Sequence, residues 1–159
     1  MTAHMRSNQP ENVTLEEVLT DLEAALYGRN YQVFLRAYRT QYLSRASAEA
    51  YVHEALGSHV APQIEPTTGP EILGAVGRAL QWTLDEHSGP EPGVLESPRF
   101  TTLLRRLLVD LEGAITQATL LARFELSDEH HPAYPVYWDF AYVIAGPQGG
   151  LVLVGSSSD

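Results

Sequence analysis

Apolar residues recur every three to four positions in several segments of the first 113 residues, which is the period of an amphipathic helix. Residues that commonly cap helices flank these segments. Thr14 and Glu17 match a capping box, Ser47 and Ser97 match single N-caps, and Gly28 matches a helix end. The pattern therefore predicts four helices, over about 14–27, 48–56, 70–87 and 97–113.

The segment 31–43 fits two interpretations. Its aromatic residues recur with a helical period, whereas the alternation of Tyr31, Val33 and Leu35 suits a strand. We expect a helix in this segment, which would be the fifth of the chain, and a strand is the alternative.

The pattern changes after Gly113, where apolar and polar residues begin to alternate as they do in a half-buried strand. A glycine-rich turn at 146–150 separates the last two alternating segments, and such a turn is typical of an antiparallel hairpin. The alternation predicts three strands, over about 120–126, 136–145 and 151–154.

These elements predict an α+β fold in which four to five N-terminal helices pack on a C-terminal three-stranded antiparallel β-meander. Residues 1–12 have no apolar pattern and fit a disordered polar tail, while residues 13–159 fit a single domain. Proline and glycine interrupt the pattern at 88–96, which we expect to be an internal loop. The serines at 156–158 fit a polar tail at the other end.

The amino-acid composition excludes several kinds of catalytic and metal-binding site. The 159 residues include no cysteine, which excludes disulfides, thiolate metal sites and cysteine nucleophiles. All ten basic residues are arginine, so a Schiff-base lysine and a P-loop lysine are excluded as well. The arginine bias, with abundant alanine, glycine and proline, suggests a bacterial protein. No motif indicates a cofactor, and we expect none.

The formal net charge of −10 determines which partners are plausible. It argues against nucleic acids and anionic membranes, since both would be repelled, and it favours a protein partner with a basic surface. No segment has the roughly 20 apolar residues that a membrane span requires. The N-terminal residues also lack the apolar centre of a signal peptide, so we expect a cytoplasmic protein. A homo-oligomer is compatible with the sequence.

Metal-ligand residue types cluster at Asp128, His130 and His131. Residues two apart on an extended chain point to the same side, so Asp128 could share a metal ion with His130, as Glu129 could with His131. Asp139 on the next strand could complete the set. A solvated loop before a proline explains the same residues without a metal, and we weigh that interpretation more heavily.

Arginine side chains are concentrated near Arg36 and Arg39, in a stretch that contains no acidic residue. On a helix these two would share a face, and neighbouring tyrosines could add hydroxyl donors, so the group could bind a phosphate or carboxylate. Alternatively, the arginines balance the acidic first helix through intramolecular ion pairs. We weigh the ion-pair interpretation more heavily.

The aromatic segment 134–140 could form a binding surface. Alternation along a strand places Tyr137 and Asp139 on one face, opposite Trp138 and Phe140. Trp138 and Phe140 fit the core, whereas Tyr137 and Asp139 could contact solvent, a ligand or a partner, because tyrosine is common at interfaces.

Two functions remain after these exclusions. In layout alone, helices followed by a meander resemble cone-shaped ligand-binding folds and toxin-neutralising immunity proteins of bacteria. With no catalytic motif, we expect a non-enzymatic, adaptor- or immunity-like protein that binds a basic partner, and the acidic face of the first helix is one candidate surface. The alternative is an enzyme or ligand receptor with a pocket between helices and sheet, in which Asp139 and a histidine meet Arg36 and Arg39.

Overall fold

The computed structural model describes residues 13–41, 47–57, 63–83, 85–126 and 136–159. The expected N-terminal tail, residues 1–12, lies outside them. Four helices are described: α1 (Leu15–Leu26), α2 (Ala48–Leu56), α3 (Gly69–Leu80) and α4 (Pro98–Gln117). The described strands are β1 (Gly28–Arg29), β2 (Gln32–Thr40), β3 (Ile64–Pro66), β4 (Gly89–Pro90), β5 (Leu120–Phe124), β6 (Val136–Gly146) and β7 (Gly149–Ser158).

The fold is α+β, but the prediction of a three-stranded meander was wrong. Five antiparallel strands form the main sheet, in the order β2-β7-β6-β5-β3, and β1 pairs with β4 in a separate two-stranded sheet. The consecutive strands β5, β6 and β7 are adjacent in this sheet, and β6 and β7 form the expected hairpin. The strands β2 and β3, which come from earlier in the chain, extend it on both sides.

The segment expected to be a fifth helix is strand β2 instead. Its odd-numbered residues Val33 and Leu35 are 4% and 2% exposed and belong to the core, whereas Arg36 is exposed. This is the two-residue alternation of a strand at the edge of a sheet. β2 pairs along its whole length with β7, from Gln32↔Ser158 to Thr40↔Gly150. Pairing with a strand more than a hundred residues later therefore decides the conformation.

The last strand is longer than expected, and the serines at 156–158 are part of it. They are 1–2% exposed, so the prediction of a polar tail was wrong. β7 lies between β2 and β6, and the aromatic side chains of β6 pack over it. A Cβ atom on Gly155 would overlap the ring of Phe140, and Ser157 accepts a hydrogen bond from the Trp138 N–H (3.2 Å). Small residues make room for these rings.

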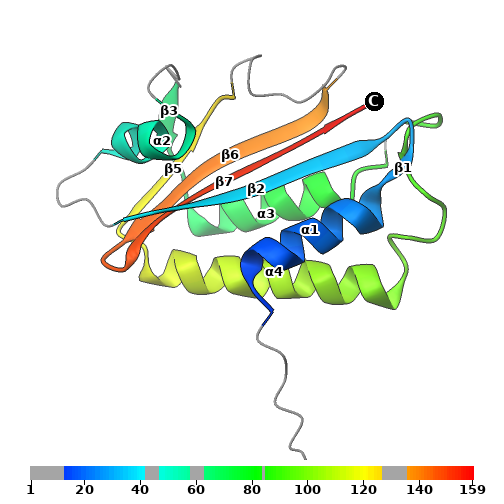
Figure 1. Ribbon diagram of the computed structural model, residues 1–159, viewed down its shortest axis with the longest axis horizontal. Coiled ribbons are helices and arrows are strands. Elements are labelled where there is room, and N and C mark those ends of the chain that lie inside the picture. Colours follow the sequence, from blue (N-terminus) through cyan, green and yellow to red (C-terminus); the bar gives the residue numbers. More distant parts are fainter. Residues whose placement is uncertain (1–12, 42–46, 58–62, 84, 127–135) are drawn as a thin grey trace, which may run out of the picture.

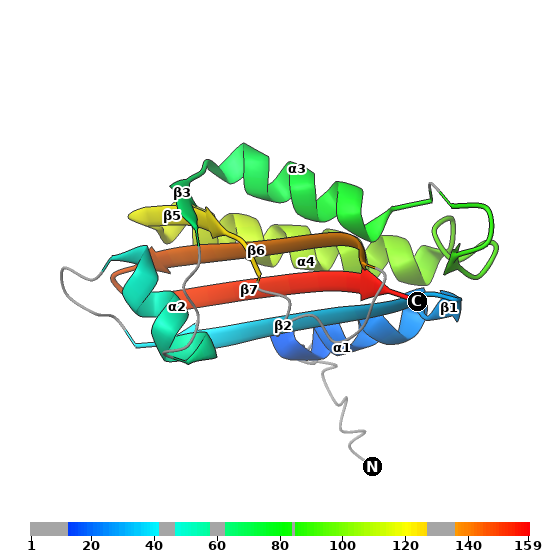
Figure 2. The same ribbon diagram turned by 90° about the horizontal axis from the view of Figure 1, so that it is seen from above.

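Helices cover both faces of the sheet (Figures 1 and 2). α1, α3 and α4 pack on one face, and α2 lies on the other, near the β6–β7 turn. Each interface contains its own core: the larger includes Leu22, Val76 and Leu107, and the smaller includes Tyr51 and Val52. No helix in the described ranges is long and apolar enough to span a bilayer.

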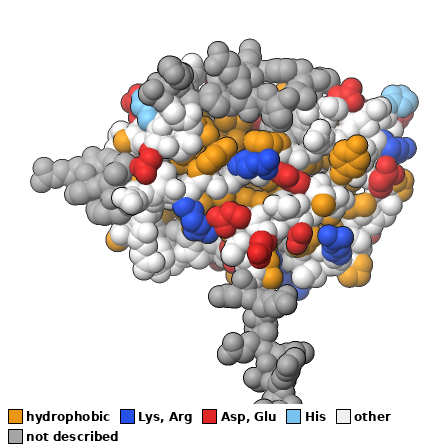
Figure 3. Space-filling model, in the orientation of Figure 1, with side chains coloured by type: hydrophobic (Ala, Val, Ile, Leu, Met, Phe, Trp, Pro, Cys, Tyr) orange, Lys and Arg blue, Asp and Glu red, His pale blue; other side chains and the backbone are white. Residues whose placement is uncertain are grey.

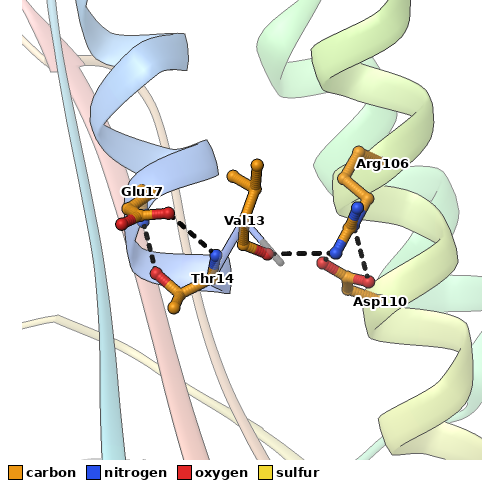
Figure 4. Close-up of polar contacts among 5 residues, drawn as sticks. All are labelled: Val13, Thr14, Glu17, Arg106 and Asp110. Carbon is orange, nitrogen blue, oxygen red and sulfur yellow. Dashed lines mark hydrogen bonds and ion pairs between the residues drawn. The ribbon is translucent and has the colours of Figure 1, made fainter. Parts of the chain in front are cut away.

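The expected start of α1 is confirmed. Thr14 accepts a hydrogen bond from the Glu17 N–H (3.2 Å), and Glu17 accepts one from the Thr14 N–H (3.0 Å), which completes the capping box (Figure 4). Beside it, the guanidinium of Arg106 on α4 donates to the carbonyl of Val13 (3.0 Å) and pairs with Asp110. Arg106 therefore joins the first turn of α1 to the middle of α4.

Two predicted helix ends were wrong. α3 stops at Leu80 rather than near His87, because Trp82 turns back to stack on Tyr31, with ring centroids 5.6 Å apart. α4 continues beyond Gly113 to Gln117, since the residues that follow keep packing against the core. A glycine inside a helix lowers stability but does not by itself end the helix.

Candidate functional site

The two arginines predicted to bind an anion both contact α1. Arg36 pairs with Glu23, and Arg39 Nε donates to Glu16 (2.9 Å). Glu23 also accepts the Leu35 N–H (2.7 Å), and the Leu35 carbonyl accepts from Arg36 (2.7 Å). This gives the ion-pair interpretation direct support, while anion binding by the arginines stays a prediction. The Glu23–Arg36 pair also covers part of the open edge of β2.

These contacts lower the effective charge of the acidic α1 face. Of the four acids on this helix, Glu16 and Glu23 pair with arginines, and Glu17 belongs to the capping box. Figure 3 shows basic and acidic side chains next to one another on the side of the molecule that carries α1 and β2. This face is therefore a weaker candidate for attracting a basic partner than the sequence suggests.

Tyr137 and Asp139 do not share a face, contrary to the alternation. The pairing of β6 with β7 shifts between Val136 and Trp138, so a bulge adds Tyr137 to the helix-covered side. There its ring stacks on Trp82 (centroids 4.9 Å apart), and its hydroxyl donates to Ser88 Oγ (2.9 Å). Tyr137 is thus half-buried in an aromatic cluster against the core rather than on an open surface.

Asp139 instead lines a hollow of about 390 Å³ at the place where β5 separates from β6. β5 pairs with β6 only from Leu120↔Ala145 to Arg123↔Tyr142, while β6 continues toward Val136. The next residue, Phe124, pairs with Ile64 of β3 on its other side. The lining residues are Gln63, Glu65, Arg123, Phe124, Glu125, Leu126, Asp139, Phe140, Ala141 and Tyr142.

Acidic side chains dominate the rim of this hollow. Glu65, Glu125 and Asp139 are all exposed, and Arg123 is the single basic residue in the lining. Arg123 Nε donates to Glu65 (3.0 Å), and this pair raises the pKa of the guanidinium above its ordinary value. The charges of Glu65 and Arg123 thus offset one another, and Glu125 and Asp139 add two further carboxylates to the lining.

Buried residues of both strands also contribute to the lining of the hollow. Phe124, Phe140 and Ala141 are buried. The Ala145 carbonyl accepts the Thr119 N–H (2.8 Å), so it points toward β5. Residues two apart on a strand direct their backbone groups to the same side, so Val143 and Ala141 also face β5, in the ladder that ends at the Arg123↔Tyr142 pair.

Tyr142 is a hydrogen-bond donor in the same place. It is 7% exposed, and burial raises the pKa of its hydroxyl above the ordinary value of 10.0, although the nearby charge of Arg123 acts in the opposite direction. The hydroxyl therefore keeps its proton at neutral pH. A ligand in the hollow would meet carboxylates, a guanidinium and a phenol.

The residues of the alternative enzyme hypothesis are not brought together. Arg36 lies on β2 and Asp139 on β6, with β7 between them, and only Asp139 lines the hollow. The proposed metal ligands Asp128, His130 and His131 lie outside the described residues. Within the described ranges, no group of three or more His, Asp or Glu side chains could hold a metal ion.

Sequence reasoning found Asp139 but missed Glu65, Arg123 and Glu125. Arg123 and Glu125 fall at alternate positions of the strand predicted over 120–126, and Glu65 falls between the helices predicted over 48–56 and 70–87. They meet because β3 pairs with β5, placing Glu65 opposite Arg123. No local pattern carries this information. The chain matches no known protein-family model, no curated protein and no solved structure, so the functional argument rests on the geometry.

Proposed function

We propose that this protein is a non-enzymatic binding module that holds a basic, extended segment of a partner protein in the hollow between β5 and β6. The observation that carries the proposal is the hollow itself, whose lining includes Glu65, Glu125 and Asp139 at the place where β5 and β6 stop pairing. An arginine or lysine of the partner would pair with Glu125, and Asp139 adds to the negative charge of the lining.

The shape of the hollow favours an extended peptide over a compact ligand. Within the described residues, β6 continues beyond its last pair with β5, and an added strand can bond to a strand edge of this kind while its side chains enter pockets on alternate sides. The stem of a long basic side chain can pack on apolar residues of the lining such as Leu126 and Ala141.

The negative charge of the protein would act on a basic partner both at long range and within the hollow. The net charge of −10 attracts a basic partner from solution and raises the association rate at low salt. At close range, the acidic lining of the hollow attracts a cationic side chain. Because Glu16, Glu17 and Glu23 are engaged within the molecule, we assign the close-range role to the hollow rather than to α1.

A labelled peptide of alternating arginine and threonine tests the proposal by fluorescence anisotropy. We expect it to bind, and we expect Glu125→Gln with Asp139→Asn to weaken binding about tenfold, as two exposed charge pairs of roughly 0.7 kcal/mol each imply. The control Glu86→Gln with Glu96→Gln removes the same charge from exposed positions outside the hollow, and should leave the affinity within about twofold.

A peptide of alternating glutamate and threonine should not bind. Equal weakening by both double variants would show that net charge alone attracts the peptide, and would contradict a site in the hollow. Unfolding curves of both variants should match those of the unmodified protein, so that a loss of binding is not a loss of fold.

A further inference from the structure

The outer surface of α4 carries an apolar groove that the proposed function does not use. It lies between α3 and α4, has a volume of about 410 Å³, and includes Leu73, Leu104 and Leu108. Val109 beside it is 57% exposed, one of two large apolar side chains in the described ranges that are so open to solvent. Apolar surface of this kind on a helix commonly marks an interaction site.

Two charged residues of opposite sign frame this groove. Arg105 and Glu112 both line it and are exposed, and within the described residues neither makes an ion pair. By contrast, Arg106 on the same helix pairs with Asp110 four residues later. Arg105 and Glu112 are seven residues apart, about 10.5 Å along the axis, and thus share one helix face.

The charged residues on this face of α4 are placed so that the face can pair with a second copy of itself. Arg105 and Glu112 lie equally far before and after the midpoint between Leu108 and Val109, and Thr101 and Thr116 lie equally far beyond them. If a second α4 runs antiparallel across this midpoint, Arg105 of each chain meets Glu112 of the other, and apolar residues meet at the centre. A twofold axis requires this kind of match, in which one patch is complementary to itself.

We propose that two copies of this chain form an antiparallel dimer through their α4 helices, with the two-fold axis near Leu108 and Val109. Burying the apolar centre supplies the main attraction, and the two symmetric Arg105–Glu112 pairs set the direction and register of the helices. The surface lies on the helical layer, away from the hollow between β5 and β6, so dimerisation leaves the peptide site open.

Charge reversal tests both the partner and the register. In sedimentation velocity over a concentration series, the unmodified protein should shift from 17.5 kDa to twice that mass. Arg105→Glu alone and Glu112→Arg alone should each raise the dimer dissociation constant at least tenfold, because like charges then meet at two places. The double variant R105E/E112R should restore dimerisation, since the pairs form again with exchanged signs.

Two further variants separate this interface from a general charge effect. Val109→Asp places two carboxylates near the axis and should give a monomer with an unchanged circular dichroism spectrum, since Val109 is already exposed. Arg99→Glu makes the same charge change as Arg105→Glu near the start of the helix, outside the groove, and should leave the dimer intact. A protein that stays monomeric, a dimer that survives V109D, or a double swap that fails to restore association would each overturn the proposal.

Discussion

Substituting alanine for Gly155 should destabilise the protein through one specific overlap. The added Cβ would lie 2.7 and 2.8 Å from ring atoms Cε1 and Cε2 of Phe140, and closer still to Cζ. The ring cannot move aside easily, because it is stacked between Trp138 and Tyr142, with centroids 5.7 and 6.0 Å away. Either these three stacked rings or the central strand β7 must shift.

We expect Gly155→Ala to lower the free energy of unfolding by about 2 kcal/mol, within the range for overpacked cores. For a protein of this length, that corresponds to a melting temperature roughly 4–8 °C lower. Shortening the opposing side chain should relieve the overlap. In a Phe140→Leu background, the same alanine should cost less than about 0.5 kcal/mol, which gives a coupling of about 1.5 kcal/mol.

Urea unfolding followed by tryptophan fluorescence measures these differences. Gly77→Ala is the matched control, since its Cβ would meet only Gln81 Nε2, at 3.9 Å. Because Gly77 lies within α3, this change should stabilise the fold by about 0.5–1 kcal/mol. A Gly155→Ala protein within about 0.5 kcal/mol of the unmodified one, or a cost unaltered by F140L, would refute the packing argument.

Two other substitutions test the surroundings of the sheet. Burial raises the pKa of Tyr142, so the folded state retains a proton that the unfolded chain releases near pH 10. The stability from this group should therefore be complete below that pH and fall as the pH rises above it, and Tyr142→Phe should reduce this fall in urea unfolding curves. Arg106→Ala removes the hydrogen bond to the Val13 carbonyl and should lower the free energy of unfolding by about 1 kcal/mol. It should also speed amide hydrogen exchange in the first turn of α1, and an unchanged exchange rate would show that this contact does not hold the helix start.

Features that depend on neighbouring residues were predicted from the sequence. The capping box at Thr14, the helix starts near Ser47 and Ser97, and the β6–β7 hairpin each follow from a few consecutive residues. The α+β class follows from the change of hydrophobic period. In these places the local preference and the final fold agree.

Features that depend on distant pairing were not predicted. The aromatic residues of β2 are compatible with helix or strand, and their partner β7 contains glycine and serine, which carry little hydrophobic signal. The hollow arises for the same reason, because β3 brings Glu65 to Arg123 across 58 residues of sequence. The bulge at Tyr137 likewise reverses an assignment that strict alternation had made.

The most direct test of the proposed function is a titration of ¹⁵N-labelled protein with the alternating arginine–threonine peptide, followed by amide chemical shifts. We predict saturable changes concentrated at the residues on the two sides of the hollow, Arg123 to Leu126 and Asp139 to Tyr142. These changes should disappear in the E125Q/D139N protein. Shifts concentrated on α1, or weak shifts spread over all acidic residues, would contradict a binding site between β5 and β6.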